Sequence, residues 1–184
     1  MATTFPGTTI EVSKLTRSSS RILFDSIFCA GGVTLSQVSL MTGIEPYAIQ
    51  NWVKRGFVGS PKHRLYSKNQ FARIVIINML RESLQIEKIC ELIRVISGVL
   101  DDESDDLISA YELYHMYVDL ISTCEFNIHD KDSVQNVAKA AADTVDSDAH
   151  TRAQISRILQ IMIYARAAVV LRQKAENIFA SLDQ

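Results

Sequence analysis

The sequence predicts a mainly α-helical protein. Only three of its 184 residues are Pro and seven are Gly, which is few for a chain of many short strands and turns. Apolar residues recur every three or four positions over much of the chain, and this is the period of an amphipathic helix. Hydrophobic residues make up 47% and charged residues 22%, as in ordinary folded proteins. The length therefore fits one large domain or two small ones, built mostly of helices.

Several classes of function lack their sequence signals. The three cysteines are odd in number and widely spaced, so they form neither a disulfide framework nor a metal-binding CxxC pair. The chain has no Gly-rich phosphate loop and no nucleophile paired with a base, and its histidines do not fall into a metal-ligand spacing. We therefore expect no enzyme activity, no cofactor and no metal. No run of about 20 residues is continuously apolar and no signal peptide stands at the start, so we expect a cytoplasmic protein without a membrane partner.

Residues 1–29 are expected to form an arm and a short helix. Nine of the first 20 residues are Ser or Thr, so we expect a mostly flexible arm in which Lys14 and Arg17 are free to meet a phosphate. The apolar residues within 22–28 then predict a short helix that ends near Gly31.

Residues 34–56 predict two helices joined by a tight turn. Thr34 forms a capping box with Gln37 at the start of the first helix. Gly43 marks the turn. Pro46 starts the second helix, because Pro is pre-set for the first helical position and needs no N–H partner there. Gly56 ends that helix.

Residues 57–66 contain Gly, Pro and several basic side chains, and they predict a loop or a short hairpin. Ser67 and Gln70 then form a second capping box. Apolar residues recur with helical spacing over residues 71–80 and again over residues 86–96. These two stripes predict two further helices.

The order helix, tight turn, helix, basic loop and helix is the outline of a winged helix-turn-helix. Residues 34–93 resemble the DNA-binding domain of the MerR family of bacterial transcription regulators, and the whole chain resembles an uncharacterised bacterial family with a MerR-like head and a helical tail. The resemblance rests on these residues and their spacing: Leu35, Thr42-Gly43-Ile44, Trp52, Gly56, Arg64-Leu65-Tyr66-Ser67, Arg81-Glu82 and Ile86-Glu87-Lys88-Ile89. It implies a winged helix-turn-helix with a small wing, at residues 30–100, that binds duplex DNA.

The predicted second helix has one apolar face and one polar face. Gln and Asn side chains on the polar face suit bidentate pairing with adenine, whereas Lys and Arg suit phosphates or guanine. The candidate DNA-binding residues are Tyr47, Gln50, Asn51, Lys54 and Arg55 on the helix, with Lys62, His63, Arg64, Tyr66 and Lys68 in and after the wing. Tyr66 also fits a place in the core of the head, as Trp52 does.

Charge divides the chain into two parts. Residues 1–86 carry ten Lys/Arg and four Asp/Glu, a net charge of +6, whereas residues 87–184 carry nine and seventeen, a net charge of −8. Five of the basic residues lie within the fifteen positions from Lys54 to Lys68. Such asymmetry favours a nucleic-acid-binding half joined to a part with another role.

The acidic run at residues 101–106 predicts a boundary, followed by an all-α tail at residues 101–184. We expect three helices there, at about residues 106–122, 133–144 and 151–182. An apolar stripe in the last helix recurs every three or four residues: Ile161, Tyr164, Ala165, Ala168, Leu171, Ala175, Ile178 and Leu182. The stripe fits either an internal core or a dimer seam, because periodicity alone does not distinguish them.

The sequence therefore predicts a sequence-specific, DNA-binding transcription regulator. Its partner is double-stranded DNA, and reading two half-sites requires a homodimer. The tail is expected to dimerise, to bind a small-molecule or protein effector, or to do both. The alternative is a protein–protein interaction module that uses the winged helix as a scaffold beside an acidic helical tail. An exposed basic face on the second helix and wing favours DNA, and an exposed apolar patch there favours a protein.

Overall fold

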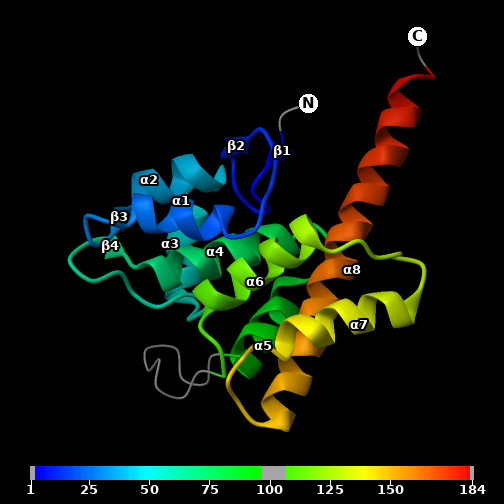
Figure 1. The fold of residues 1–184 in the computed structure, drawn as a ribbon. Coiled ribbons are helices and arrows are strands. Elements are labelled where there is room, and N and C mark those ends of the chain that lie inside the picture. The colour runs from blue at the N-terminus through cyan, green and yellow to red at the C-terminus, as the bar shows by residue number, and fades with distance from the viewer. Residues whose placement is uncertain (1–2, 97–106, 183–184) are drawn as a thin grey trace.

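A computed structural model describes residues 3–96 and 107–182 of the chain (Figure 1). It is 63% helix and 5% strand, which confirms the mainly α-helical prediction. The elements are β1 (Thr3–Thr4), β2 (Glu11–Val12), α1 (Ser19–Ile27), β3 (Val33–Thr34), α2 (Leu35–Thr42), α3 (Pro46–Lys54), β4 (Leu65–Tyr66), α4 (Lys68–Leu80), α5 (Ile86–Ile96), α6 (Ala110–Thr123), α7 (Lys131–Ala142) and α8 (Ala149–Ala180). The acidic run expected to form the boundary, residues 101–106, lies outside the described residues.

Local sequence signals explain where most of these helices begin. Thr34 accepts from the Gln37 N–H and the Gln37 side chain accepts from the Thr34 N–H, so the predicted capping box of α2 is present. Ser67 and Gln70 form the same box at α4. Pro46 stands at the first position of α3, as expected.

The apolar core continues across the expected boundary at residue 100. In α1, Phe24 is fully buried. The centroid of its ring lies 5.1 Å from that of Phe71 in α4 and 5.2 Å from that of Tyr114 in α6. The rest of α4 is buried nearly all round, with its 71–77 segment inside the core. Figure 1 shows α4 and α6 at the centre of the molecule, with the other elements around them. The division into head and tail stays a prediction, and α4 and α6 share one core across it.

Residues 3–20 pack against the body, contrary to the expected flexible arm. β1 and β2 form an antiparallel pair with Thr3 opposite Val12. Phe5 is 1% exposed, and the Tyr114 hydroxyl of α6 donates to the Pro6 carbonyl at 2.9 Å. Gly7 adopts φ +74°, where a Cβ would lie 2.4 Å from the Val75 carbonyl oxygen. A single aromatic side chain and a tight glycine turn thus anchor a segment whose composition resembles a free arm.

α8 has two different halves. Its first half lies against α7 and buries a row of apolar side chains: Ile155, Ile158, Leu159, Met162 and Ile163. Its second half extends beyond the body, and Figure 1 shows it (orange to red) projecting away from the other elements. By length and composition alone α8 is apolar enough to cross a membrane. An 18-residue window within it has a mean hydropathy of 1.3, and 44% of that window is buried inside the protein. A long core helix meets the same criterion, so the absence of a membrane partner stays a prediction.

Candidate nucleic-acid interface

The α2–α3 pair places one helix face outside the core. Gly43 follows α2 with φ +69° and donates its N–H to Ser39 O at 2.8 Å, which turns the chain sharply into α3. In α3, Ile49 and Trp52 are buried. Because helical residues three and four apart share a face, the intervening positions of α3 point outward. The side chains exposed there are Tyr47, Gln50, Asn51 and Lys54.

A tight turn projects beside α3 from the short sheet of β3 and β4. Val33 pairs with Tyr66 and Thr34 with Leu65. The Leu65 N–H donates to Lys62 O at 2.9 Å, which closes the turn over the exposed residues His63 and Arg64. We call this segment the 62–65 turn, and it is the position predicted for the wing.

The 62–65 turn holds two side chains in a backbone conformation that favours glycine. His63 has φ +51° and Arg64 has φ +66°. Two consecutive positive φ angles are typical of the hairpin turn that Asn-Gly or Asp-Gly usually forms. Residues held in such conformations at a cost are concentrated at functional sites. The positive φ angles of His63 and Arg64 therefore favour a functional role for these two side chains.

The predicted basic residues differ in how free their charges are. Among the described residues, Lys54, Lys62 and Arg64 have neither an ion pair nor a side-chain hydrogen bond. Arg55 instead donates from Nη2 to Glu87 Oε1 at 3.2 Å, and its guanidinium lies 4.4 Å from the centroid of the Phe57 ring. That contact holds Arg55 against α5 and offsets its charge.

Two of the predicted residues lie away from this surface. Tyr66 is 3% exposed, and burial raises the pKa of its hydroxyl. The ring of Tyr66 belongs to the core at β3 and β4, so the prediction that Tyr66 donates to a DNA phosphate is wrong. Lys68 lies 3.7 Å from Asp25 Oδ1 and 4.3 Å from the Tyr111 ring centroid, so it faces α1 and α6. Its charge is offset there, and it joins these helices rather than the α3 face.

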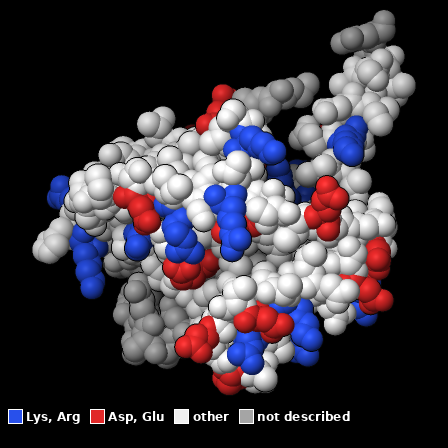
Figure 2. Space-filling model, viewed as in Figure 1, with Lys and Arg blue, Asp and Glu red and all other residues white. Residues whose placement is uncertain are grey.

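Figure 2 shows how the charges lie on one face of the molecule. Lys and Arg side chains gather at its left edge, over the end of the molecule where Figure 1 draws β3, β4 and the loop between α3 and β4. Basic and acidic side chains are mixed over the central elements in the same view. The β3–β4 end is therefore basic in this view, with no acidic side chain among the Lys and Arg at the left edge.

The α2–α3 surface also carries exposed apolar side chains, of which Leu40 was not among the predicted residues. Leu40 of α2 is 77% exposed and Tyr47 of α3 is 72% exposed. Leu65, in β4, is partly exposed as well. The signal was present for Leu40, because it lies between Val38 and Thr42, which are both buried, and so falls on the outer side of α2.

Comparison with known proteins gives two matches. Residues 33–117 match the family model described as a domain of unknown function, DUF1836, and this stretch begins at β3 and ends within α6. The uncharacterized protein YkrK of Bacillus subtilis (strain 168) is 33% identical over 86 residues, which make up 45% of this chain and 37% of YkrK. The chain thus covers less than half of the length of that relative. No solved structure matches. The stretch that matches the family model therefore includes the α3 face and the 62–65 turn.

Proposed function

We propose that this protein is a sequence-specific, DNA-binding transcription regulator whose head is a MerR-like winged helix-turn-helix. One observation carries the proposal. The polar face of α3 (Tyr47, Gln50, Asn51 and Lys54) is exposed beside a turn that presents Lys62, His63 and Arg64 without acidic partners among the described residues. The resemblance to the MerR family remains a prediction from the sequence.

The two parts of this surface have different roles in the proposal. α3 is nine residues long, a size that fits the major groove, and its Gln50 and Asn51 read base edges. Lys54, Lys62 and Arg64 contact phosphates, which positions the helix but carries no sequence information. Affinity then depends on salt, because each phosphate contact releases counterions from the DNA.

A titration of DNA fragments from the region upstream of its own gene tests the proposal. Fluorescence anisotropy at low and at moderate salt is expected to show binding that weakens steeply with salt. A variant with Lys54, Lys62 and Arg64 changed to Ala is expected to reduce the slope of log affinity against log salt by about three. The matched control changes three exposed basic residues of α8, Arg157, Arg166 and Lys174, to Ala and leaves the slope unchanged. Binding no tighter than that of a neutral control protein at low salt would refute the proposal.

The proposed partner of the second half of α8 is a second copy of this chain. Of the predicted stripe, Ala165 is buried, whereas the other seven residues lie in solvent in the single chain. Their spacing alternates strictly between three and four residues, which is the heptad pattern of a two-stranded coiled coil: Ile161, Tyr164, Ala168, Leu171, Ala175, Ile178 and Leu182. Pairing two copies through this seam supplies the two-fold symmetry that two DNA half-sites need.

A second candidate function is a protein-binding module that uses the same scaffold. The exposed Leu40 and Tyr47 favour it, because large apolar side chains on an outer face mark interaction surfaces. Changing both residues to Ser separates the two functions. Loss of salt-dependent DNA binding in this double variant would favour the first function, because it would show that apolar contacts help α3 to bind DNA. Unchanged DNA binding combined with loss of a protein partner would favour the second function.

A further inference from the structure

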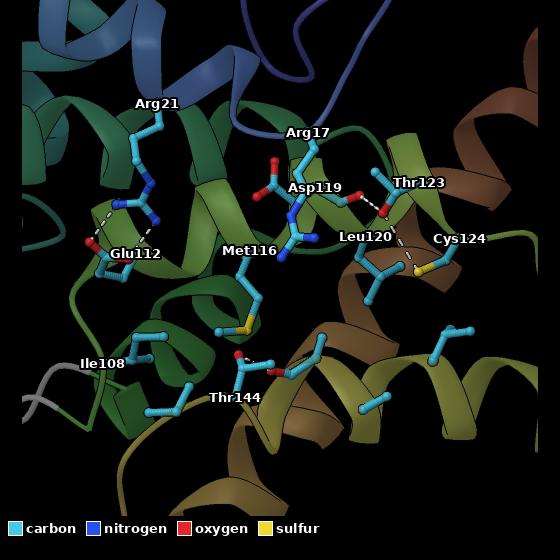
Figure 3. A pocket seen from close by; sticks show the side chains of 14 residues that line it. Arg17, Arg21, Ile108, Glu112, Met116, Asp119, Leu120, Thr123, Cys124 and Thr144 are labelled. Atoms are coloured by element: carbon cyan, nitrogen blue, oxygen red, sulfur yellow. Dashed lines mark hydrogen bonds and ion pairs between the residues drawn. The ribbon is translucent and has the colours of Figure 1, made fainter.

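A cavity lies between the N-terminal segment, α6 and α7. Its volume is about 520 Å³, within the range of pockets that hold small organic ligands. Figure 3 shows Arg17 and Arg21 entering from the N-terminal segment and α1, with Met116 and Leu120 of α6 below them. The cavity does not include any residue of the α3 face or of the 62–65 turn.

Half of the fourteen residues that line this cavity are apolar. α6 and the segment just before it contribute thioether and aliphatic side chains, and α7 and the loop after it contribute small or β-branched ones. These residues are Ile108, Met116, Leu120, Val137, Ala140, Ala141 and Val145. Such a floor covers a hydrocarbon body well, because its removal from water is favourable and no polar group of the floor loses a partner.

Of the four charged side chains of the lining, Arg21 and Glu112 form an ion pair with each other, whereas Arg17 and Asp119 have no ion pair with a described residue. Arg21 donates from both Nη atoms to Glu112 at 2.7 Å each, so both charges are offset. Asp119 Oδ1 accepts from the Ser18 N–H at 2.7 Å. Arg17 has neither an ion pair nor a side-chain hydrogen bond with a described residue. The cavity therefore offers, at its edge, one guanidinium without a direct partner among the described residues, with the Asp119 carboxylate nearby.

The backbone beside Arg17 is anchored to α6, and this anchor places the exposed Arg17 side chain at the edge of the cavity. Ser18 has φ +61°, a conformation that non-glycine residues rarely adopt, and its N–H bond to Asp119 spans 101 positions of the chain. Figure 3 shows the Arg17 side chain directed downward from this anchor, toward Met116.

The surrounding acids restrict what kind of anion fits. Glu112 and Asp119 line the same cavity, so a phosphate or other dianion meets two carboxylates beside one free cation. A single carboxylate pairs bidentately with one guanidinium and brings less negative charge than a dianion next to these two acids. We propose that this cavity binds a monocarboxylate with an apolar body, with Arg17 holding the carboxylate and the α6–α7 floor covering the hydrocarbon. The proposal does not depend on DNA binding.

Isothermal titration of the full chain with octanoate tests this site. Octanoate is expected to bind, whereas acetate, which has the charge but no body, is expected to bind far more weakly. Arg17→Gln is expected to weaken octanoate binding about tenfold or more, because a hydrogen-bonded charge pair is lost, and to leave 1-octanol binding unchanged. Lys14→Gln, a control in the same segment outside the cavity lining, keeps wild-type affinity. Equal octanoate affinity in wild type and Arg17→Gln, or no octanoate binding by wild type, would overturn the proposal.

Two cysteines give an independent readout in one molecule. Cys124 lines the cavity and Cys29 does not, and both thiols are exposed. Bound octanoate is expected to slow the alkylation of Cys124 by iodoacetamide and to leave the rate at Cys29 unchanged. Ala140→Trp, which fills the cavity from an exposed position of α7, is expected to abolish both octanoate binding and the protection. Equal protection of the two cysteines would identify general surface binding and overturn the proposal.

Discussion

Ser20 of α1 and His115 of α6 form a buried hydrogen bond with 2.7 Å between Ser20 Oγ and His115 Nδ1. The two residues are 95 positions apart, and both are fully buried. The imidazole lies edge-on to the rings of Phe24 and Tyr111. Its other nitrogen, Nε2, has no partner among the described residues. A neutral imidazole suits this site, because the imidazolium ion requires an acceptor at both nitrogens.

The stability of the protein is expected to fall with acid through His115. Burial lowers the pKa of His115 from 6.5 to about 4, with Arg21 adding to the effect and Glu112 opposing it. The folded state therefore binds fewer protons than the unfolded state, and stability that is present above pH 6.5 is lost as the pH falls toward 4. The full loss is about 3 kcal/mol. Urea unfolding at a series of pH values measures it.

A matched pair of variants assigns this loss to one residue. His115→Gln is expected to flatten the profile above pH 4.5, whereas His129→Gln, in an exposed loop, is expected to leave it unchanged. Asp25 and Glu112 contribute at lower pH, because hydrogen bonds from Tyr111 and Arg21 lower the pKa of these carboxyls from 3.8 and 4.5. A profile of equal slope in wild type and His115→Gln would show that His115 is not responsible.

Asn78 joins three parts of the chain, and its loss is expected to destabilise the fold. Its Nδ2 donates to Gly7 O and to Thr42 O, both at 2.9 Å, so α4 holds the N-terminal loop and the end of α2. Asn78→Leu keeps the size of the side chain but leaves two carbonyls without a donor. The expected loss in the free energy of unfolding is about 2 kcal/mol. Asn177→Leu, on the exposed end of α8, is expected to change it by less than about 0.5 kcal/mol.

The sequence predicted the elements whose signals are local. The capping boxes at Thr34 and Ser67 and the Pro at position 46 fix helix starts through contacts within four residues, so they can be identified without knowledge of the fold. Tyr111, Tyr114 and Tyr117 lie in the core, and their spacing of three residues on α6 is that of one helix face. The same spacing could not predict that the Tyr111 hydroxyl donates to Asp25 and the Tyr114 hydroxyl to Pro6 O.

Features that depend on distant contacts could not be predicted. Phe5 is buried because Pro6 and Gly7 bring it against α4 and α6, and no periodicity surrounds it. In the candidate site, the exposed α3 face followed from helical spacing, but the pairing of Arg55 with Glu87 and of Lys68 with Asp25 required the tertiary structure. Charge counting along the sequence therefore overestimated the free positive charge.

Arg64 is expected to oppose stability and to support DNA binding. Arg64→Gly relieves a positive φ that costs about 1–2 kcal/mol in a side-chain-bearing residue, against a glycine entropy cost of about 0.5–1 kcal/mol. A net gain of about 0.5–1 kcal/mol in unfolding free energy is expected. Affinity for the specific DNA site (the operator) and for random DNA is expected to fall by the same factor. The slope of log affinity against log salt is expected to be lower by about one. Arg64→Lys, which keeps the charge and the strained backbone, should keep both values. A loss of stability in Arg64→Gly would contradict the prediction.

Gln50 and Asn51 are expected to carry the choice of DNA sequence. Gln50→Ala or Asn51→Ala removes a bidentate base contact, and the preference for operator over random DNA is expected to fall by about 1–3 kcal/mol in each. Competition titrations with the two DNAs at one salt concentration measure this ratio. Gln173→Ala, at an exposed position of α8, serves as the control. An unchanged ratio in both α3 variants would move base recognition away from α3.

Leu171 is expected to decide whether the chain pairs with a second copy. It lies in the middle of the exposed stripe of α8 and is 52% exposed in the single chain. Leu171→Asp therefore costs little in a monomer, but in a coiled-coil seam it buries a charge without a partner, which is strongly unfavourable. Light scattering is expected to give the mass of two chains for wild type and of one chain for Leu171→Asp, with operator affinity reduced in the variant. Gln173→Asp adds the same charge two residues away, off the stripe, and is expected to remain a dimer. A wild-type mass of one chain at micromolar concentration would refute the seam, and the stripe would then need another partner, because no described part of the chain covers it.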